Sequence, residues 1–172
     1  MIRNSGLCFC VFILCSFSIL AQEASELEKR HGFKDIKLNT PVDSVKGVKL
    51  KKEFKERNEF DAKLYEVDHP AYKKIGEVNV KQVELKAYKG LIYQIFVVAD
   101  KDPRLMKALE SIYGKADYDM KNETYFWKGS SIMLKFKSHS KNELEMVYDS
   151  PVVYSKMKED KAKKIENIAD DF

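Results

Sequence analysis

Cysteine is scarce in this chain and is confined to one end of it. Only three of the 172 residues are cysteines, and they are Cys8, Cys10 and Cys15. Once that end is removed, no residue is left that can form a disulfide, a thiolate metal ligand or a thiol nucleophile. The seven glycines and four prolines are also too few for a collagen-like repeat or a low-complexity linker.

Long apolar runs are missing as well. The one extended apolar segment, Leu7–Leu20, has 14 residues, short of the roughly 20 that cross a bilayer as a helix. What the chain does contain is 44% hydrophobic residues, which excludes a disordered protein, and 34% charged residues, which excludes a membrane-embedded bundle. Its length fits one domain with one core.

The apolar segment has the features of an export signal. Arg3 gives it a positively charged start, its length suits a signal-peptide core, and the small residue Ala21 follows it. The sequence predicts a signal peptide over residues 1–21 with cleavage after Ala21, and a periplasmic or secreted protein. An uncleaved membrane anchor is the alternative. Cleavage would leave 151 residues with a net charge of +3, because the lost segment holds one basic residue and no acid.

Three parts follow the predicted signal. Residues 22–32 are polar and predict a flexible or weakly helical leader, in which His31 is an isolated exposed residue. Residues 33–150 carry the strand and helix patterns of a single α+β domain. Residues 151–172 predict a helical tail, with its helix from about residue 155 to 169, either over the sheet or projecting into solvent. The tail has apolar residues along one helical face, namely Tyr154, Met157, Ile165 and Ile168.

The first half of the domain combines one short helix with strands. Alternating apolar residues predict a strand over Phe33–Leu38. Thr40 as N-cap, Pro41 at the first position and Asp43 as its capping partner predict a helix, which Gly47 ends. Strands around residues 48–54 and 64–67 follow.

The longest strands come next. Within Val78–Tyr88 the apolar positions shift by one residue, which predicts a bulge near Lys81-Gln82. Lys89-Gly90 predicts a two-residue hairpin turn. Residues 91–99 are apolar on both faces, as in a central, doubly buried strand.

The second half repeats this plan. Asp102, Pro103 and Gly114 mark the start and end of a helix. Three strands follow, over Thr124–Lys128, Ile132–Lys137 and Glu143–Tyr148. Their predicted inward residues are Tyr125, Trp127, Ile132, Leu134, Phe136, Leu144, Met146 and Tyr148. We therefore predict an α+β fold of tandem αβββ-like units, forming one curved antiparallel sheet with helices on one face.

Common catalytic and binding motifs are missing. There is no dinucleotide-binding, phosphate-binding or nucleophile-elbow motif. The segment Asp117–Asp119 begins like a calcium loop, but Lys121 stands at the third ligand position. Asn122 begins a glycosylation sequon, which matters only in a eukaryotic secretory pathway. No catalytic, cofactor-binding or metal-ligating residue is predicted.

Two acidic features are the weak candidates for chemistry. Asp68-His69 is the only place in the sequence where an acidic residue stands next to a histidine. All three histidines, His31, His69 and His139, lie in apparent loops, and their spacing is not that of metal ligands. Glu143 and Glu145 share one strand face, where outward-facing edge charges are the simpler interpretation than a carboxylate pair.

Two further features suggest binding. Lys46–Arg57 holds six basic residues against two acids, which makes it the candidate for a polyanion or lipid surface. It contains only one aromatic residue, Phe54, so it lacks the stacking platform of a nucleic-acid site, and nucleic acid is not an expected partner. A second candidate is an aromatic cluster, interpretable as core or as a ligand groove. Its members are Tyr93, Tyr125, Trp127 and Tyr148.

Several phrases resemble small exported proteins of Gram-negative bacteria of the Bacteroidota type. They are F-K-D-I-K-L-N-T-P-x-x-x-V (Phe33–Val45), S-I-Y-G-K (Ser111–Lys115) and Y-F-W-K (Tyr125–Lys128), together with a signal ending in Ala21-Gln22. The plan of helices on an antiparallel sheet resembles the β-lactamase-inhibitor-protein-like and small outer-membrane-assembly lipoprotein folds. The resemblance carries no catalytic or binding motif, and this chain lacks a lipid-accepting cysteine.

These features together predict a non-enzymatic binding or scaffold module. The expected partner is a protein or peptide, recognised in the periplasm through a face of the sheet. The alternatives are a hydrolase with a site around Asp68-His69 and a binder of polyanions or lipid surfaces through Lys46–Arg57. The sequence predicts no cofactor and leaves the oligomeric state open.

Overall fold

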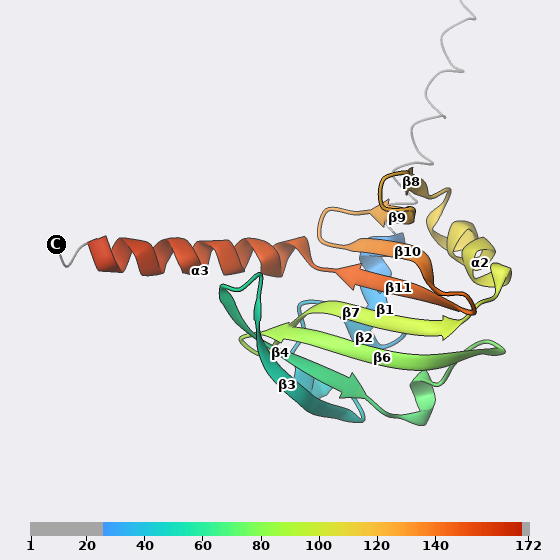
Figure 1. The fold of residues 1–172 in the computed structure, drawn as a ribbon, viewed down its shortest axis with the longest axis horizontal. Helices are drawn as coiled ribbons and strands as arrows, with labels where there is room; N and C mark the ends of the chain where they lie inside the picture. Colours follow the sequence, from blue (N-terminus) through green and yellow to red (C-terminus); the bar gives the residue numbers. More distant parts are fainter. Residues whose placement is uncertain (1–25, 170–172) are drawn as a thin grey trace, which may run out of the picture.

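The computed structural model describes residues 26–169 and has an α+β fold with a large antiparallel sheet (Figure 1). The predicted signal peptide, its cleavage after Ala21 and the three cysteines lie outside the described residues. None of the helices within residues 26–169 is both long enough and apolar enough to cross a membrane.

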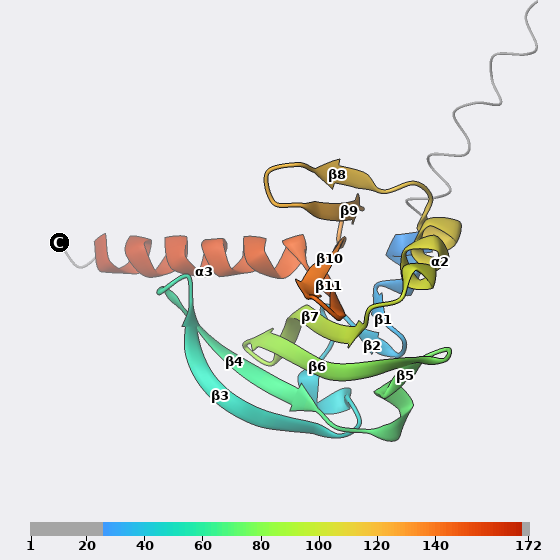
Figure 2. The same cartoon turned by 45° about the vertical axis from the view of Figure 1, so that its right-hand side comes forward.

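Nine strands form the main sheet in the order β3-β4-β6-β7-β11-β10-β9-β8, with β5 paired to β6. Every pairing is antiparallel, as predicted. The strands are β3 (Val48–Glu56), β4 (Phe60–Val67), β5 (Lys74–Ile75), β6 (Val78–Tyr88), β7 (Leu91–Asp100), β8 (Asp117–Asp119), β9 (Thr124–Lys128), β10 (Met133–Ser140) and β11 (Glu143–Asp149). Figure 2 shows how the sheet curves between its β3–β4 end and its β8–β9 end.

The central hairpin follows the prediction closely. The β6–β7 register shifts between Val80 and Gln82, so the bulge is where the apolar pattern placed it. Tyr88 pairs with Leu91 around the two-residue turn Lys89-Gly90, whose φ angles are 49° and 80°. Both are in the left-handed region that a tight hairpin turn of this kind requires. Strand β7 lies in the middle of the sheet and is mostly buried.

The start of the domain differs from the prediction. A single strand over 33–38 is wrong, because the chain folds back on itself there as a small hairpin of β1 (Gly32–Phe33) and β2 (Ile36–Lys37). The turn between them takes Lys34 to a φ of 54°. Folding back buries both Phe33 and Ile36, which an extended strand would place on opposite faces.

The helix predicted after Thr40 is also reduced. Only the three-residue 3-10 helix η1 (Val42–Ser44) forms. Thr40 does not cap it, because the Thr40 hydroxyl donates backwards to the carbonyl of Lys37, and Asp43 makes no capping bond. A second 3-10 helix, η2 (Pro70–Tyr72), follows β4. The first predicted αβββ unit therefore has a 3-10 turn where the second has an α-helix.

Helix α2 (Pro103–Tyr113) confirms the predicted signals. The Asp102 carboxylate accepts a hydrogen bond from the Arg104 amide at 2.8 Å, and Gly114 ends the helix with a φ of 83°. The three following strands also form, although Tyr125 is not buried. Its side chain has the predicted inward orientation but stays 40% exposed, and its ring packs only on Tyr118 of β8, which is itself 49% exposed.

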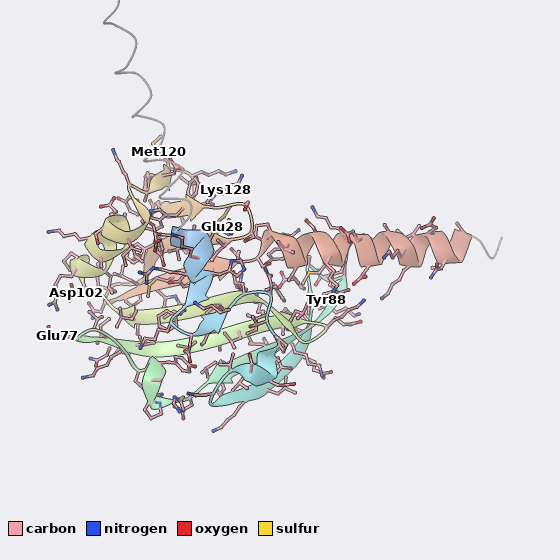
Figure 3. The ribbon with its side chains drawn as sticks, turned by 180° about the vertical axis from the view of Figure 1, so that it is seen from behind. Glu28, Glu77, Tyr88, Asp102, Met120 and Lys128 are labelled. Atoms are coloured by element: carbon pink, nitrogen blue, oxygen red, sulfur yellow. The ribbon has the colours of Figure 1, made fainter. Side chains whose placement is uncertain are left out.

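One face of the sheet is covered and forms the main core. The N-terminal segment and α2 both pack on this face, and Figure 3 shows the N-terminal segment (blue) lying across the strands. The predicted inward residues of β10 and β11 belong to this core, as does Trp127 of β9. We call this the covered face.

The leader is not free of the domain. Residues 26–30 form a helical turn, and Leu27 is buried in the main core. His31 is only partly exposed, and its ring lies within hydrogen-bonding distance of the Asn39 side chain. For residues 26–30 the helical alternative of the prediction therefore holds, whereas the expected exposure of His31 is wrong.

Helix α3 (Pro151–Ala169) begins four residues earlier than predicted. Its first part docks on the sheet, and its second part projects into solvent. Val153 and Met157 are buried against Ala62, Tyr88 and Tyr93, on the face opposite the main core. Residues 161–169 are exposed, and Figure 1 shows this end of α3 extending away from the sheet.

Candidate functional site

The sheet has a second face that is only partly covered. Helix α3 occupies this face where the β3–β4 and β6–β7 hairpins turn. Over the middle of β6, β7, β11 and β10 no described helix lies across it, as Figure 1 shows. We call this area the open face.

The centre of the open face is apolar. In the cross-strand register, Val147 of β11 lies between Phe96 of β7 and Lys135 of β10, and Lys135 pairs in turn with Phe126 of β9. Phe96, Phe126 and Val147 are all partly exposed and belong to neither core cluster. The open face therefore presents a row across four adjacent strands, in which three side chains are solvent-accessible and apolar and the fourth, on β10, is Lys135.

The charges on the open face are paired within it. Asp149 is buried and accepts hydrogen bonds from Gln94 Nε2 at 2.7 Å and Lys135 Nζ at 2.8 Å. Glu145 lies 3.3 Å from Lys137 Nζ and within 2.7 Å of a ring nitrogen of His139. These contacts fix the long side chains in place and leave this area with little uncompensated charge.

The interpretation of Glu143 and Glu145 as edge charges is wrong. They lie on β11, which is an interior strand between β7 and β10. Glu145 is only 9% exposed, and Glu143 accepts a hydrogen bond from the Ser140 hydroxyl. His139, expected in a loop, lies within β10, where its ring packs edge-on against Phe96 at 5.8 Å.

A hollow lies beside this row at the β8–β10 end. Its volume is about 380 Å³, and Phe126, Met133 and Lys135 are among the residues that line it, together with Asp119 and Asn122. Asp119 is engaged by the local turn, since it accepts hydrogen bonds from the Lys121 amide and the Asn122 side chain. Within residues 26–169, no cluster of three or more His, Cys, Asp or Glu side chains is positioned to hold a metal ion.

The predicted aromatic cluster does not form. Trp127 and Tyr148 lie in the main core on the covered face, whereas Tyr93 packs under α3 on the other face. Tyr125 instead stacks on Tyr118 of β8, with ring centroids 4.7 Å apart. Strand β7 pairs with β11 and not with β9, and a one-residue bulge at Tyr93 turns that ring to the opposite face.

The Asp68-His69 pair is not assembled for catalysis. Asp68 faces Lys73, with its carboxylate 2.6 Å from Nζ, and this ion pair holds the pKa of Asp68 below its usual value. His69 Nδ1 accepts a 3.3 Å hydrogen bond from the Ala71 amide and so caps η2. Neither residue lines the cavities described here. The geometry gives the hydrolase alternative no support.

The basic run Lys46–Arg57 is distributed rather than gathered. Most of it forms β3, an edge strand whose side chains alternate between the two faces. Lys51 pairs with Glu84 at 2.6 Å and Lys55 with Asp61 at 2.7 Å, while the Arg57 guanidinium lies over the Tyr154 ring. The alternation and the pairing weaken the case for a polyanion site.

A polar cluster that the sequence does not reveal joins the leader to the β9–β10 turn. Glu28 accepts hydrogen bonds from the Ser131 amide at 2.8 Å, the Ser130 hydroxyl at 2.9 Å and the Ser131 hydroxyl. His31 Nδ1 lies 3.4 Å from the same Ser131 hydroxyl. Figure 3 shows Glu28 close to Lys128 at the end of β9.

The arrangement of Ser131, His31 and Glu28 does not allow the histidine to activate the serine as a nucleophile. The Asn39 Nδ2 amide, which only donates, lies 3.0 Å from His31 Nε2, so that nitrogen accepts and the neutral ring carries its proton on Nδ1. Nδ1 therefore donates toward Ser131 and cannot take its proton. The Ser131 hydroxyl is committed to Glu28.

We expect the Glu28 contacts to stabilise the fold at neutral pH. Partial burial raises the pKa of Glu28, but the hydrogen bonds from Ser131 and Ser130 outweigh it, so the net pKa is below its ordinary value of 4.5. A group whose pKa is lowered by folding stabilises above the unfolded pKa and loses this contribution as the pH falls through the folded value. Glu28→Gln should therefore lower the free energy of unfolding by about 1.5 kcal/mol at pH 7.

Urea unfolding at pH 7 and at pH 3 measures this effect. The difference between Glu28→Gln and the wild type should shrink at pH 3, because the wild-type carboxyl is then becoming neutral. A difference of the same size at both pH values would contradict the charged hydrogen bonds. Glu110→Gln is a matched control, since Glu110 is a partly exposed glutamate on α2.

The chain matches no protein-family model, no curated protein and no solved structure. The candidate site therefore rests on the chemistry of its own residues. From the sequence, a face of the sheet was predicted to be the binding site, and the strand pattern places Phe96 and Val147 on one face. The sequence pattern does not show that α3 stops short of these two residues.

Proposed function

We propose that this chain is an exported, non-enzymatic binding module that recognises a protein or peptide surface with the open face of its sheet. The observation that carries the proposal is the accessible row Phe126, Val147 and Phe96, set among charges that are already paired. Apolar and aromatic groups at the centre of a patch with a compensated polar surround are the composition of protein interfaces.

The paired charges favour a protein partner over a polyanion. Affinity for nucleic acid or another polyanion depends on cations that are free to replace counterions. On the open face Lys135 and Lys137 are each engaged by an acidic neighbour. A partner that buries Phe96 and Val147 gains apolar contact area without having to separate these ion pairs.

The export part of the proposal rests on residues 1–21 and Ala21. We also infer kinship with the exported Bacteroidota proteins that the Phe33–Val45 phrase resembles. A β-lactamase-inhibitor-protein-like or assembly-lipoprotein-like plan belongs to the same inference, and it is compatible with the α+β fold and its partly open antiparallel sheet.

Two adjacent residues of β9 provide a matched test by photo-crosslinking. Phe126 is on the open face and Tyr125 is exposed on the opposite side of the same strand. We would place a photoreactive phenylalanine analogue at each position of the full chain and irradiate the cells that produce it. The expected result is a discrete protein adduct from position 126 that is missing from position 125.

A second substitution checks that the adduct reports on the apolar row. Phe96→Ala, combined with the crosslinker at 126, should reduce the adduct about tenfold or more, because removing a central aromatic contact costs about 2 kcal/mol. Lys107→Ala on the exposed side of α2 is the control and should leave it unchanged. Adducts from position 125 alone, or from neither position, would count against the open face.

A further inference from the structure

A cleft on the covered face lies between α2 and the β1–β2 hairpin. Its volume is about 270 Å³, and its walls include Phe33 from the hairpin and Leu105, Leu109 and Ile112 from α2. Only Leu105 and Tyr113 of α2 are buried, whereas Leu109 and Ile112 stay partly exposed. The helix thus leaves part of its apolar stripe uncovered along this cleft.

Two tyrosines that line the cleft have hydroxyls without a hydrogen-bond partner among residues 26–169. Tyr113 is 7% exposed and Tyr148 is 4% exposed, and neither hydroxyl hydrogen-bonds to another residue within 26–169. Every fully enclosed polar side-chain atom in this part of the chain does have a partner. The two hydroxyls must therefore be accessible, and the cleft that both rings line is the space through which a partner can reach them.

Burial also keeps these hydroxyls protonated. It raises the pKa of Tyr113 and of Tyr148 above the ordinary value, more than the nearby Arg30 charge lowers it. Both phenols are therefore hydrogen-bond donors at any physiological pH. A carboxylate bound in the cleft would offer these accessible donors a charged acceptor in place of water, and hydrogen bonds to charged groups are the stronger ones.

The charged residues of the cleft all have one sign. Arg30, Lys34 and Lys37 line it, and no acidic residue among those described does. Arg30 is the least engaged of the three, since its nearest carboxylate oxygen, on Glu26, is 3.8 Å away. Lys34 and Lys37 donate to backbone carbonyls, which hold them beside the hairpin.

We propose that this cleft binds a small amphiphilic monocarboxylate. Its chain lies along the apolar walls, and its carboxylate accepts hydrogen bonds from the tyrosine hydroxyls and pairs with Arg30. The volume equals that of roughly nine water molecules at about 30 Å³ each, which suits a chain of about eight carbons. This inference concerns the covered face and is independent of the open-face proposal.

The single tryptophan gives a direct readout with the full chain. Trp127 packs edge-on against Tyr113, with ring centroids 6.2 Å apart, so occupation of the cleft should change its fluorescence. Octanoate is the probe, and 1-octanol has the same chain without the charge. We expect a saturable change with octanoate and binding of 1-octanol that is about tenfold weaker, since hydrogen bonds to a charged group are the stronger ones.

Two substitutions separate the contributions of charge and hydroxyl, and a third is their control. Arg30→Gln should weaken octanoate binding about tenfold and leave 1-octanol binding unchanged. Tyr148→Phe keeps the ring and should weaken octanoate severalfold. Lys107→Gln, on the exposed side of α2, is the matched control and should change neither. No saturable change with octanoate, or equal binding of the two ligands that is indifferent to Arg30→Gln, would overturn the proposal.

Discussion

Gly32→Ala is expected to lower the free energy of unfolding by about 4 kcal/mol. Gly32 has a φ of +152°, which is reserved almost entirely for glycine, and a Cβ built there would sit 2.1 Å from the carbonyl oxygen of Ile36. Both atoms belong to the β1–β2 hairpin, in which Gly32 pairs with Lys37. The clash is with backbone, so no side-chain rotation relieves it. Backbone strain alone costs about 1–3 kcal/mol, and the contact adds to it.

Gly76→Ala is the control that isolates the contact. Gly76 also has a positive φ, +59°, but nothing lies within 4 Å of the position that its Cβ would take. Gly76→Ala should lower the free energy of unfolding by only about 1 kcal/mol, the penalty for a non-glycine residue in the left-handed region. Urea denaturation followed by circular dichroism gives both values. If Gly32→Ala is no more destabilising than Gly76→Ala, the tight hairpin is not formed as described.

The second large effect is expected for Met157→Ala, which should lower the free energy of unfolding by about 3 kcal/mol. Met157 is only 1% exposed and packs with Val153 of α3 against Ala62, Tyr88 and Tyr93. Truncating a buried methionine loses its transfer free energy and leaves a cavity, which together cost about 2–5 kcal/mol. Docking of α3 is therefore predicted to be part of the stability of the domain.

The same helix supplies the comparison. Ile165 lies two turns further along α3 and is 58% exposed, so Ile165→Ala should change the free energy of unfolding by less than about 0.5 kcal/mol. Denaturant midpoints of the two variants test the predicted contrast. Similar midpoints for Met157→Ala and Ile165→Ala would mean that α3 does not dock on the sheet.

Features set by neighbouring residues were predictable from the sequence. The turn Lys89-Gly90 forms because its residues tolerate positive φ, and α2 begins at Pro103 because Asp102 caps it. The bulge at Lys81 is recorded directly in the phase of the apolar residues around it. In each case the decisive interaction spans only a few positions of the chain.

Features set by distant segments were not predictable. Tyr125 has the right orientation but remains exposed, because the layer that buries Trp127 of the same strand does not extend over it. Leu27 and Glu28 look like parts of a polar leader, but Leu27 is buried in the main core and Glu28 finds its partners in the β9–β10 turn, about a hundred residues later. The open face has the same origin: Phe96 is accessible only because of where α3 ends its contact with the sheet.

The strand order also constrains when the domain can assemble during synthesis. Strands β3 to β7 form one half of the sheet and β8 to β10 the other, and β11 is the strand that joins them, between β7 and β10. Its residues, Glu143–Asp149, follow those of every other strand of the sheet in the sequence. Because β11 pairs with β7 from Glu143–Asp100 to Asp149–Gln94, the two halves cannot join into one sheet until β11 has been synthesised.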